Sequence, residues 1–309
     1  MTIAVHASEF AGLPVIDFDP ESGIVDPTGM IYRLSVDYDA EEPFMVLLSR
    51  FFEDPNAGQV PGLVIGAWQG DEQDLSSESI VEALVAARES LTSLRALFLG
   101  DIISEENEIS WIQQSDVTPL FDAYPDLEIF RVRGGSNLVI GTIRHQNLRS
   151  LVIETGGLDA EAVRGICSSD LPRLEHLELW LGSDGYGANV TVADLEPILQ
   201  GKLFPSLVRL GIRNCESADE FARALAKAPV LQQLDVLDMS LGNLTDEGAL
   251  ALAENPAIAG LDLLDIHFHY VSDETICRLE AVGAKVNADD RQEPDEYCGE
   301  VSRYIAVSE

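Results

Sequence analysis

His267 and His269 are a pair of residues whose spacing could hold a metal ion. In a β-strand, residues i and i+2 share a face, so both imidazoles could bind a cation together with Asp238 or Asp265. His269, however, falls at a position of the sequence repeat described below that normally turns inward where the strand ends. We therefore predict one exposed and one buried histidine, and no metal site.

Two other features could do chemistry, and each has a simpler interpretation. The glycine-rich stretch 182–187 superficially resembles a phosphate-binding loop, but it has no Lys after its last glycine and does not match G-x-G-x-x-G. We interpret it as a long loop between two repeats. Cys215 is expected to be a small buried residue. Since no His lies at a spacing that identifies a base for Cys or Ser, we predict a protein without catalytic activity or cofactor.

Arginines and aromatic residues are concentrated at positions that point outward from the predicted strands. These positions carry seven arginines, whereas an even spread of the 19 basic residues would place about two there. Arg and aromatic residues are enriched in interface hot spots, so we predict a surface that binds a protein or peptide. Its candidate residues are Arg131, Arg133, Arg149, His176, Trp180, Arg209, Arg213, Asp238 and Asp265.

Some of these arginines have a structural alternative. At one outward position, opposite charges alternate in consecutive repeats, at Arg95, Glu128, Arg149 and Glu175. Parallel strands lie about 4.8 Å apart, so these residues could simply pair with one another. Arg209 and Arg213 have weaker neighbours for pairing and are the better candidates for ligand contact. Trp180 should lie beside Arg213 and could stack on it, which would leave the guanidinium edge free for a carboxylate.

An internal repeat with the spacing L-x-x-L-x-L defines these faces. The strongest copies begin at Leu207, Leu234 and Leu261, with a constant step of 27 residues. Further copies begin at Leu174, Leu148, Leu127 and Leu94, and weaker ones at Val60 and Ile31. The fourth and sixth positions alternate around an outward residue, which predicts a short strand with one buried face. The second half of most copies has helical periodicity.

A unit of one strand and one helix cannot bury its apolar face alone, but stacked units share one core. About nine such units predict an α/β fold, a right-handed horseshoe-shaped solenoid with a parallel sheet on its concave side and helices on its convex side. We predict that residues 31–285 form the repeats and residues 1–30 an amino-terminal cap. Residues 286–309 are predicted to form an acidic carboxyl-terminal cap that folds back to close the last repeat.

The pattern resembles the leucine-rich-repeat superfamily, in the long-repeat style of the ribonuclease inhibitor, over roughly residues 30–285. The segment 234–248 matches best, although the Asn usual at its ninth position is Gly242 here. The segments 10–18 and 303–309 also resemble an uncharacterised bacterial family of such proteins. That resemblance implies a gene setting with radical-SAM and ATP-grasp-like enzymes, and no established activity.

The charge of the chain excludes two classes of partner. Its 309 residues include 54 acidic and 19 basic ones, which gives a formal net charge of −35. Nucleic acids and anionic membranes are themselves negative, so we predict neither as a partner. No run approaches the roughly 18 apolar residues of a membrane span, and the first 18 residues do not resemble a secretory signal. A cytoplasmic monomer is expected.

Two functions follow from these observations. The first is a non-catalytic interaction scaffold that binds a protein or peptide on its concave face. The alternative is an accessory component that presents a substrate peptide to the enzymes of a bacterial biosynthetic group. The partner's identity distinguishes them.

Overall fold

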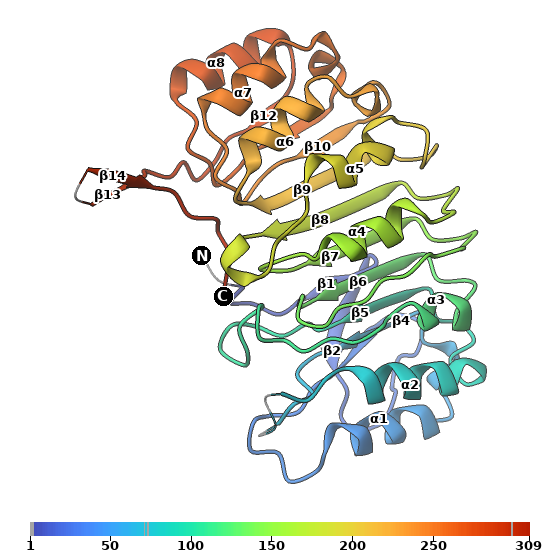
Figure 1. Cartoon of the computed structure of the whole chain (residues 1–309). Coiled ribbons are helices and arrows are strands. Elements are labelled where there is room, and N and C mark those ends of the chain that lie inside the picture. Colours follow the sequence, from blue (N-terminus) through green and yellow to red (C-terminus); the bar gives the residue numbers. More distant parts are fainter. Residues whose placement is uncertain (1–2, 71, 73, 298) are drawn as a thin grey trace.

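The computed structural model describes residues 3–70, 72, 74–297 and 299–309. Twelve strands form one sheet, in which each strand lies beside the next in chain order (Figure 1). Neighbouring strands are parallel, except that the first two are antiparallel. The strands are β1 (Glu9–Phe10), β2 (Leu13–Asp17), β3 (Ile31–Leu34), β4 (Gly62–Ile65), β5 (Ala96–Leu99), β6 (Ile129–Arg133), β7 (Ser150–Glu154), β8 (His176–Gly182), β9 (Arg209–Cys215), β10 (Val236–Asp238), β11 (Leu263–Asp265) and β12 (Val286–Asn287). The α-helices of the described residues are α1 (Phe44–Glu53), α2 (Glu78–Ala86), α3 (Pro119–Ala123), α4 (Ala160–Cys167), α5 (Val192–Leu199), α6 (Ala218–Leu225), α7 (Asp246–Ala253) and α8 (Asp273–Val282).

The helices lie on one side of the sheet, so the sheet has a helix-covered face and a helix-free face (Figure 1). Helix α6 shows why its sequence packs there, because Ala218, Phe221 and Leu225 fall on one stripe and are buried. Thr191 and Asp194 form the capping box that starts α5. The result is a mixed α/β structure with a long, mostly parallel sheet, and it fits a leucine-rich-repeat-like fold.

The repeat register predicts the pairing of the strands from β4 to β11. The inward leucine at the fourth repeat position lies beside its counterpart in each neighbouring strand, as Leu177, Leu210, Leu237 and Leu264 do. All four are 1% exposed or less, and they belong to one continuous apolar cluster that extends from Phe18 to Ala284. One core, rather than two globular ones, therefore stabilises the described chain.

The register of the first repeat is wrong by two residues. The sequence pattern aligned Ile31 with Val60, whereas the structure pairs Tyr32 with Leu63 and Leu34 with Ile65. Tyr32 takes the inward position that the pattern reserves for an aliphatic residue. Its ring is 1% exposed and packs against the rings of Phe18 and Phe51. An aromatic cluster therefore replaces the leucine layer at this end of the sheet.

The amino-terminal segment, residues 3–10, crosses the helix-free face before the chain enters β2 (Figure 1). Phe10 packs on Val64, Ala96 and Phe98, which point outward from β4 and β5 and are buried beneath it. The backbone N–H of Ala7 donates to the Asp101 carboxylate, 3.1 Å away. This part of the helix-free face therefore carries a second apolar layer.

The carboxyl-terminal segment does not stop at the last repeat. Strand β12, at the start of the segment 286–309 that was predicted to close the last repeat, pairs with β11. A hairpin of β13 (Asp295–Tyr297) and β14 (Glu300–Ser302) then projects from the body (Figure 1). Residues 304–309 return to the middle of the sheet, where the Ala306 N–H donates to the carbonyl of Leu241.

Candidate functional site

A buried network of charges lies on the helix-free face beside β5, β6 and β7. Glu154 and Asp101 are completely buried, and Arg133 is 4% exposed. Arg133 donates through Nε to Glu154 at 2.7 Å, and its Nη1 lies 3.4 Å from Asp101 Oδ1. Arg131 also pairs with Glu154, and both guanidinium groups lie over the ring of Phe98, 4.6 and 5.2 Å from its centroid. The predicted ligand residues Arg131 and Arg133 are therefore engaged within the chain.

The protonation of Glu154 follows from these contacts. Burial alone would raise the pKa of its carboxyl group, but Arg131 and Arg133 outweigh burial and hold the pKa below its usual value. Glu154 is consequently an ionised carboxylate between two cations. This arrangement joins β6 and β7 and leaves little of Arg133 for a partner, whereas the Arg131 side chain remains 31% exposed.

A second network lies further along the sheet, on β8, β9 and β10. The guanidinium carbon of Arg213 lies 5.2 Å from the Trp180 ring centroid, so the predicted stacking is confirmed. The guanidinium edge, however, is not free, and that part of the prediction is wrong. Arg213 Nη1 donates to Glu178 at 2.8 Å, and Nε lies 3.2 Å from Asp238 Oδ2. Both carboxylates come from the fifth repeat position of the flanking strands, which faces the same side as Arg213.

Trp180 is also not the exposed anchor that its outward position suggests. Its side chain is 6% exposed because the tail residues Ala306 and Val307 lie on it, together with Leu241 and Phe268. Its indole N–H donates to Glu178 at 2.7 Å. Replacing Trp180 would therefore remove core contacts, contrary to the expectation of a pure binding residue.

The pKa values of the two acids that flank Arg213 shift in opposite directions. Burial alone would raise the pKa of Glu178, but its bonds to His176, Arg213 and Trp180 outweigh burial and lower it. Burial raises the pKa of Asp238, because the attraction of Arg213 does not fully compensate for it. Asp238 is thus the acid of this network that is most easily protonated.

A row of four residues, one from each of four strands, lies on the helix-free face, with Arg209 exposed and the other three half-buried. His176, Arg209, Val236 and Leu263 pair in sequence from β8 to β11, and none of them is buried. We call these four residues together with Asp265 the open surface. Gly211 has no side chain at the fifth position of β9, and a small depression there is bounded by His176, Arg209, Val236 and Asp238.

Arg209 is the exposed cation of this row, and in the described part of the chain it makes no ion pair. Beside it, His176 is held from two sides, with Nδ1 3.0 Å from Ser150 Oγ and Nε2 3.4 Å from Glu178 Oε2. Ser150 was not among the predicted residues, because it lies one repeat away from His176 and only the strand pairing brings the two together. The hydroxyl and the carboxylate fix the orientation of the imidazole ring.

The charge ladder predicted at the second repeat position is present only in part. Arg149 pairs with Glu175 on the neighbouring repeat at 2.9 Å, as the alternation of charge suggests. Arg95 instead lies 3.5 Å from Asp126, on the loop before β6. Arg149 is therefore a surface residue with an internal partner, and it contributes less to the open surface than Arg209 does.

The histidine pair separates as predicted into one partly exposed and one buried ring. His267 Nδ1 lies 2.8 Å from Asp265 Oδ1, and this hydrogen bond raises the pKa of His267. Burial alone would raise the pKa of Asp265, but its contacts with His267 outweigh burial and lower it. His269 is fully buried beside the carbonyl of Ala288, 3.0 Å from its Nε2, and burial lowers its pKa. The two imidazole rings therefore lie in different environments, one partly exposed and one buried.

Cys215 and the glycine-rich stretch have the structural roles that we expected. Cys215 is 3% exposed, and burial raises the pKa of its thiol to about 12. The stretch begins with Gly182, the last residue of β8, and continues in a short 3-10 helix at Asp184–Tyr186. Gly182 has a positive φ of 77°, and a Cβ there would meet the Gly156 carbonyl at 1.9 Å, so the turn requires glycine.

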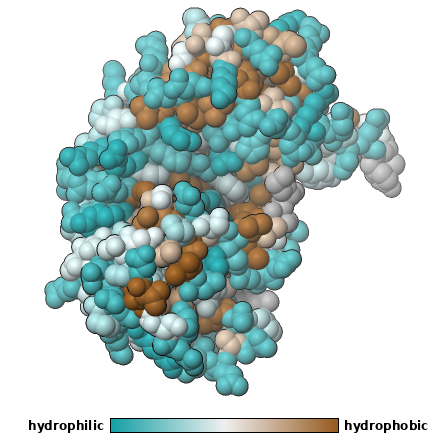
Figure 2. Space-filling view, turned by 180° about the vertical axis from the view of Figure 1, so that it is seen from behind, coloured by the Kyte–Doolittle hydropathy of each residue, from teal (hydrophilic) through white to brown (hydrophobic). Residues whose placement is uncertain are grey.

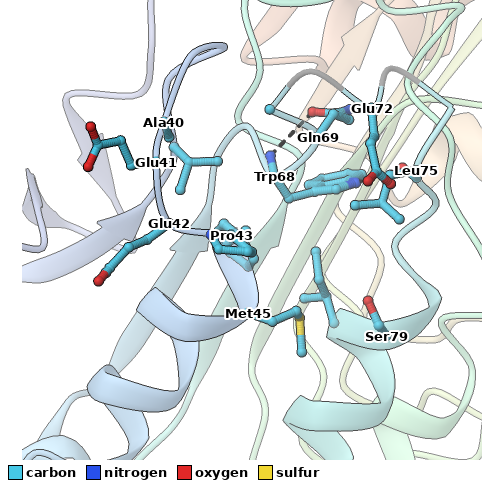
Figure 3. Close-up of a pocket in the computed structure, with 14 residues that line it drawn as sticks. Ala40, Glu41, Glu42, Pro43, Met45, Trp68, Gln69, Glu72, Leu75 and Ser79 are labelled. Carbon is cyan, nitrogen blue, oxygen red and sulfur yellow. Dashed lines mark hydrogen bonds between the residues drawn. The ribbon is translucent and has the colours of Figure 1, made fainter.

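Figure 2 looks onto the helix-free side, where apolar residues form patches among hydrophilic ones. A separate cavity of about 400 Å³ lies near the start of α1 and α2. Figure 3 shows Met45, Trp68 and Leu75 beside it, with the acidic Glu41 and Glu72 at its edge. None of the predicted binding residues lines this cavity, so it is distinct from the open surface.

The fold and these surfaces define a mixed α/β protein with one long, mostly parallel sheet built from consecutive repeats. None of the described helices combines the length and the apolar character needed to cross a bilayer. A protein from Bacteroides fragilis, solved by the Northeast Structural Genomics Consortium, has 33% sequence identity and a TM-score of 0.79, and the match covers 84% of this chain and 74% of that one. The chain belongs to the same family as this Bacteroides fragilis protein.

A more distant match is an internalin from Listeria monocytogenes, with 14% identity and a TM-score of 0.42, which covers 85% of this chain and 67% of the internalin. At that level of similarity it supports no statement about this chain. No model of a protein family and no curated protein matches the sequence.

Proposed function

We propose that this chain is a non-catalytic interaction scaffold of the leucine-rich-repeat type, a right-handed horseshoe whose open surface binds a protein or peptide. The observation that carries the proposal is the contrast within the helix-free face. Along β4 to β7 that face is covered by residues 3–10 or engaged in buried ion pairs, whereas His176, Arg209, Val236 and Leu263 lie uncovered in a continuous row. Parallel strands with uncovered side chains at regular spacing suit an extended partner.

The charges of the open surface indicate the chemistry of this partner. Asp235 and Asp262 are exposed beside the row, and Asp265 is part of it, whereas Arg209 is its exposed cation. A partner that presents basic groups to the aspartates and one carboxylate to Arg209 would be complementary. Charges at such a surface mainly set the association rate and the specificity, and salt weakens their effect.

A second candidate function is that of an accessory component that presents a substrate peptide to the enzymes of a bacterial biosynthetic group, of the radical-SAM and ATP-grasp-like kinds. One observation favours it. The molecule already holds a peptide segment, its own residues 304–309, through hydrogen bonds to the main chain of that segment. The same contacts are available to the main chain of another peptide.

Affinity capture from the native host tests the first candidate. We expect the wild-type chain to retain a partner that Arg209→Glu loses, because the substitution reverses the exposed cation of the row. Glu89→Arg, an equally large charge change on the helix-covered side, should retain it, since the Glu89 side chain is 87% exposed and far from the row. Equal capture by all three chains would contradict the open surface.

The identity of the captured protein separates the two candidates. Biosynthetic enzymes lost with Arg209→Glu favour the accessory role, whereas a partner of unrelated function favours the general scaffold. Turnover of a substrate by the isolated chain would contradict both candidates.

A further inference from the structure

A groove at the carboxyl ends of β8 to β11 holds residues 304–309. Ile305, Ala306 and Val307 are 8%, 3% and 4% exposed there. Ala306 and Val307 pack into an apolar cluster that is separate from the main core. On the groove side, this cluster consists of Ile109, Trp180, Leu241 and Phe268, with Ile3 packed against it. The tail is therefore a peptide without regular secondary structure, bent at Ala306, that lies in an apolar groove.

Two side chains of the groove grip the backbone of the tail. Asn214 accepts a hydrogen bond from the N–H of Val307 at 3.0 Å and donates one to the carbonyl of the same residue at 2.5 Å. The Tyr270 hydroxyl does the same for Tyr304, with both distances 3.0 Å. Each side chain thus satisfies both main-chain groups of one residue, and the two gripped residues are three positions apart.

Further contacts continue the same form of recognition. The Leu241 carbonyl accepts from the Ala306 N–H at 2.8 Å, and Ser110 Oγ donates to the Ser308 carbonyl at 2.5 Å. Hydrogen bonds to the main chain give affinity for any extended segment, while pockets for alternate side chains give specificity. The polar contacts of this groove are therefore those of a peptide-recognition site.

The buried side chain of Asn214 needs a peptide in the groove to satisfy its hydrogen bonds. Asn214 is completely buried, with a positive φ of 49° that Asn tolerates better than most residues, and its amide faces the tail. With the groove empty, most of the hydrogen-bonding capacity of this amide would be unused, which is costly for a buried polar group. The geometry suits a groove that always contains a peptide, either the tail or a competitor.

We propose that this groove binds a short segment of a partner protein in the conformation of the tail, and that residues 304–309 occupy it until that segment displaces them. The inference rests on the proposed function and names the chemistry of the partner. The segment has small or β-branched apolar residues at the places of Ala306 and Val307. A basic residue precedes it, because Arg303 of the tail lies over the Tyr270 ring at 5.9 Å.

The tail is built as a displaceable occupant. It is joined to the body through the projecting β13–β14 hairpin, so residues 304–309 can leave without breaking the pairing of β12 or of the other strands of the sheet (Figure 1). A partner is a better competitor than a second copy of this chain. Each copy carries a formal net charge of −35, and an exchange of tails would bring two strongly acidic bodies together.

Binding of a labelled synthetic peptide with the sequence of residues 301–309 tests the groove. The recipient is the full chain with Val307→Asp, which places a charge in the apolar cluster and releases the tail. Fluorescence anisotropy should show the peptide binding at least tenfold tighter to this variant than to the wild type. Adding Asn214→Leu to Val307→Asp should weaken binding at least tenfold, while a peptide with Asp at the place of Val307 should not bind.

A second measurement uses the wild-type chain and does not depend on the folding of a variant. Hydrogen–deuterium exchange of the amides of Ala306 and Val307 should accelerate when the unlabelled peptide is added in excess, because displaced amides lose their partners. Unchanged exchange at saturating peptide would overturn the proposal. So would a Val307→Asp chain that keeps its native circular dichroism but does not bind the peptide.

Light scattering distinguishes the two possible sources of the segment. A wild-type chain that dimerises as its concentration rises, and that loses dimerisation with Asn214→Leu, would overturn the assignment to a partner in favour of tail exchange. The proposal for the groove and the proposal for the open surface can be contradicted independently. If Arg209→Glu loses the captured partner while the groove does not bind the peptide, only the groove proposal is wrong.

Discussion

Along β4 and β5, the fifth repeat position carries Val64 and Phe98, which are completely buried beneath the segment that contains Phe10. Along β9 and β10, the same position carries Gly211 and Asp238, beside a depression on the open surface. The strand geometry is the same in both regions. What differs is the presence of a covering segment, so direction away from the core and exposure to solvent are separate properties in this fold.

This difference explains the distribution of charged pairs. Where residues 3–10 cover the sheet, Asp101, Arg133 and Glu154 form a network of buried ions with internal partners. Where no segment covers it, Arg209 stays exposed, and in the described residues it is not paired. An arginine that points outward from a repeat strand is thus a candidate for ligand contact only in the uncovered region.

The largest expected effect is in the covered region. Glu154→Gln should lower the free energy of unfolding by about 3–5 kcal/mol, because it removes the carboxylate charge that pairs with the buried Arg133 and with the partly exposed Arg131. The pKa of Glu154 is held below its usual 4.5, so its contribution is present above that pH and is lost as the pH falls through the folded value. Denaturant melts at pH 7 and pH 4 measure both effects.

Arg209→Ala is the matched control in the uncovered region, and it should change the free energy of unfolding by less than about 0.5 kcal/mol. An equal loss for Glu154→Gln and Arg209→Ala would erase the distinction between the two regions.

Removing the Phe10 ring, which covers β4 and β5, is the second test of the comparison between the covered and uncovered regions. Phe10→Ala should cost about 3 kcal/mol, because it deletes the contacts of a buried ring with Phe98, whose centroid lies 5.8 Å away. It should also expose the outward side of β4 and β5, which binding of a hydrophobic dye would report. A variant as stable as the wild type would show that residues 3–10 do not form a second layer.

Protonation tests the uncovered region at a finer scale. The hydrogen bond between His267 and Asp265 raises the pKa of His267 above its usual 6.5. The nearby Arg213 lowers this pKa, and Asp238 raises it further. A raised histidine pKa means that the stabilisation is complete below pH 6.5 and is lost as the pH rises through the folded value. The melting temperature of His267→Asn should therefore lie furthest below that of the wild type at pH 6 and approach it by pH 9. A constant difference would contradict this assignment.

The smallest expected effect concerns the exposed acids beside the open surface, Asp235 and Asp262. Added salt should raise the melting temperature between low and physiological ionic strength, because screening over about 8 Å weakens the repulsion within a chain of net charge −35. Asp262→Asn should raise stability at low salt by less than about 0.5 kcal/mol and reduce this salt dependence. Calorimetry at several salt concentrations measures both, and a melting temperature that falls with salt would contradict the prediction.

The sequence predicted the sheet better than the site, for a physical reason. Leucine spacing records which side chains face the core, so the pairing of Leu177 with Leu210 and of Leu210 with Leu237 could be read from it. It failed at Tyr32, where aromatic packing replaces the leucine pattern. The burial of Trp180 by the tail could not be predicted from the sequence, because the contact between Trp180 and Val307 joins distant parts of the chain. One signal was present in hindsight: large apolar residues at outward positions, such as Phe98 and Trp180, coincide with apolar terminal segments.

The cluster around Trp180 also affects how the molecule unfolds. An array of repeats whose contacts join only neighbours can lose its end units one at a time. Here Ile3 packs against the same cluster as Val307, so segments from opposite ends of the described chain meet over β8 in the middle of the array. Fraying at either end removes part of this shared cluster and therefore weakens the attachment of the other end. We expect this latch to give the array the cooperativity of a globular domain, with a single unfolding transition in place of progressive melting.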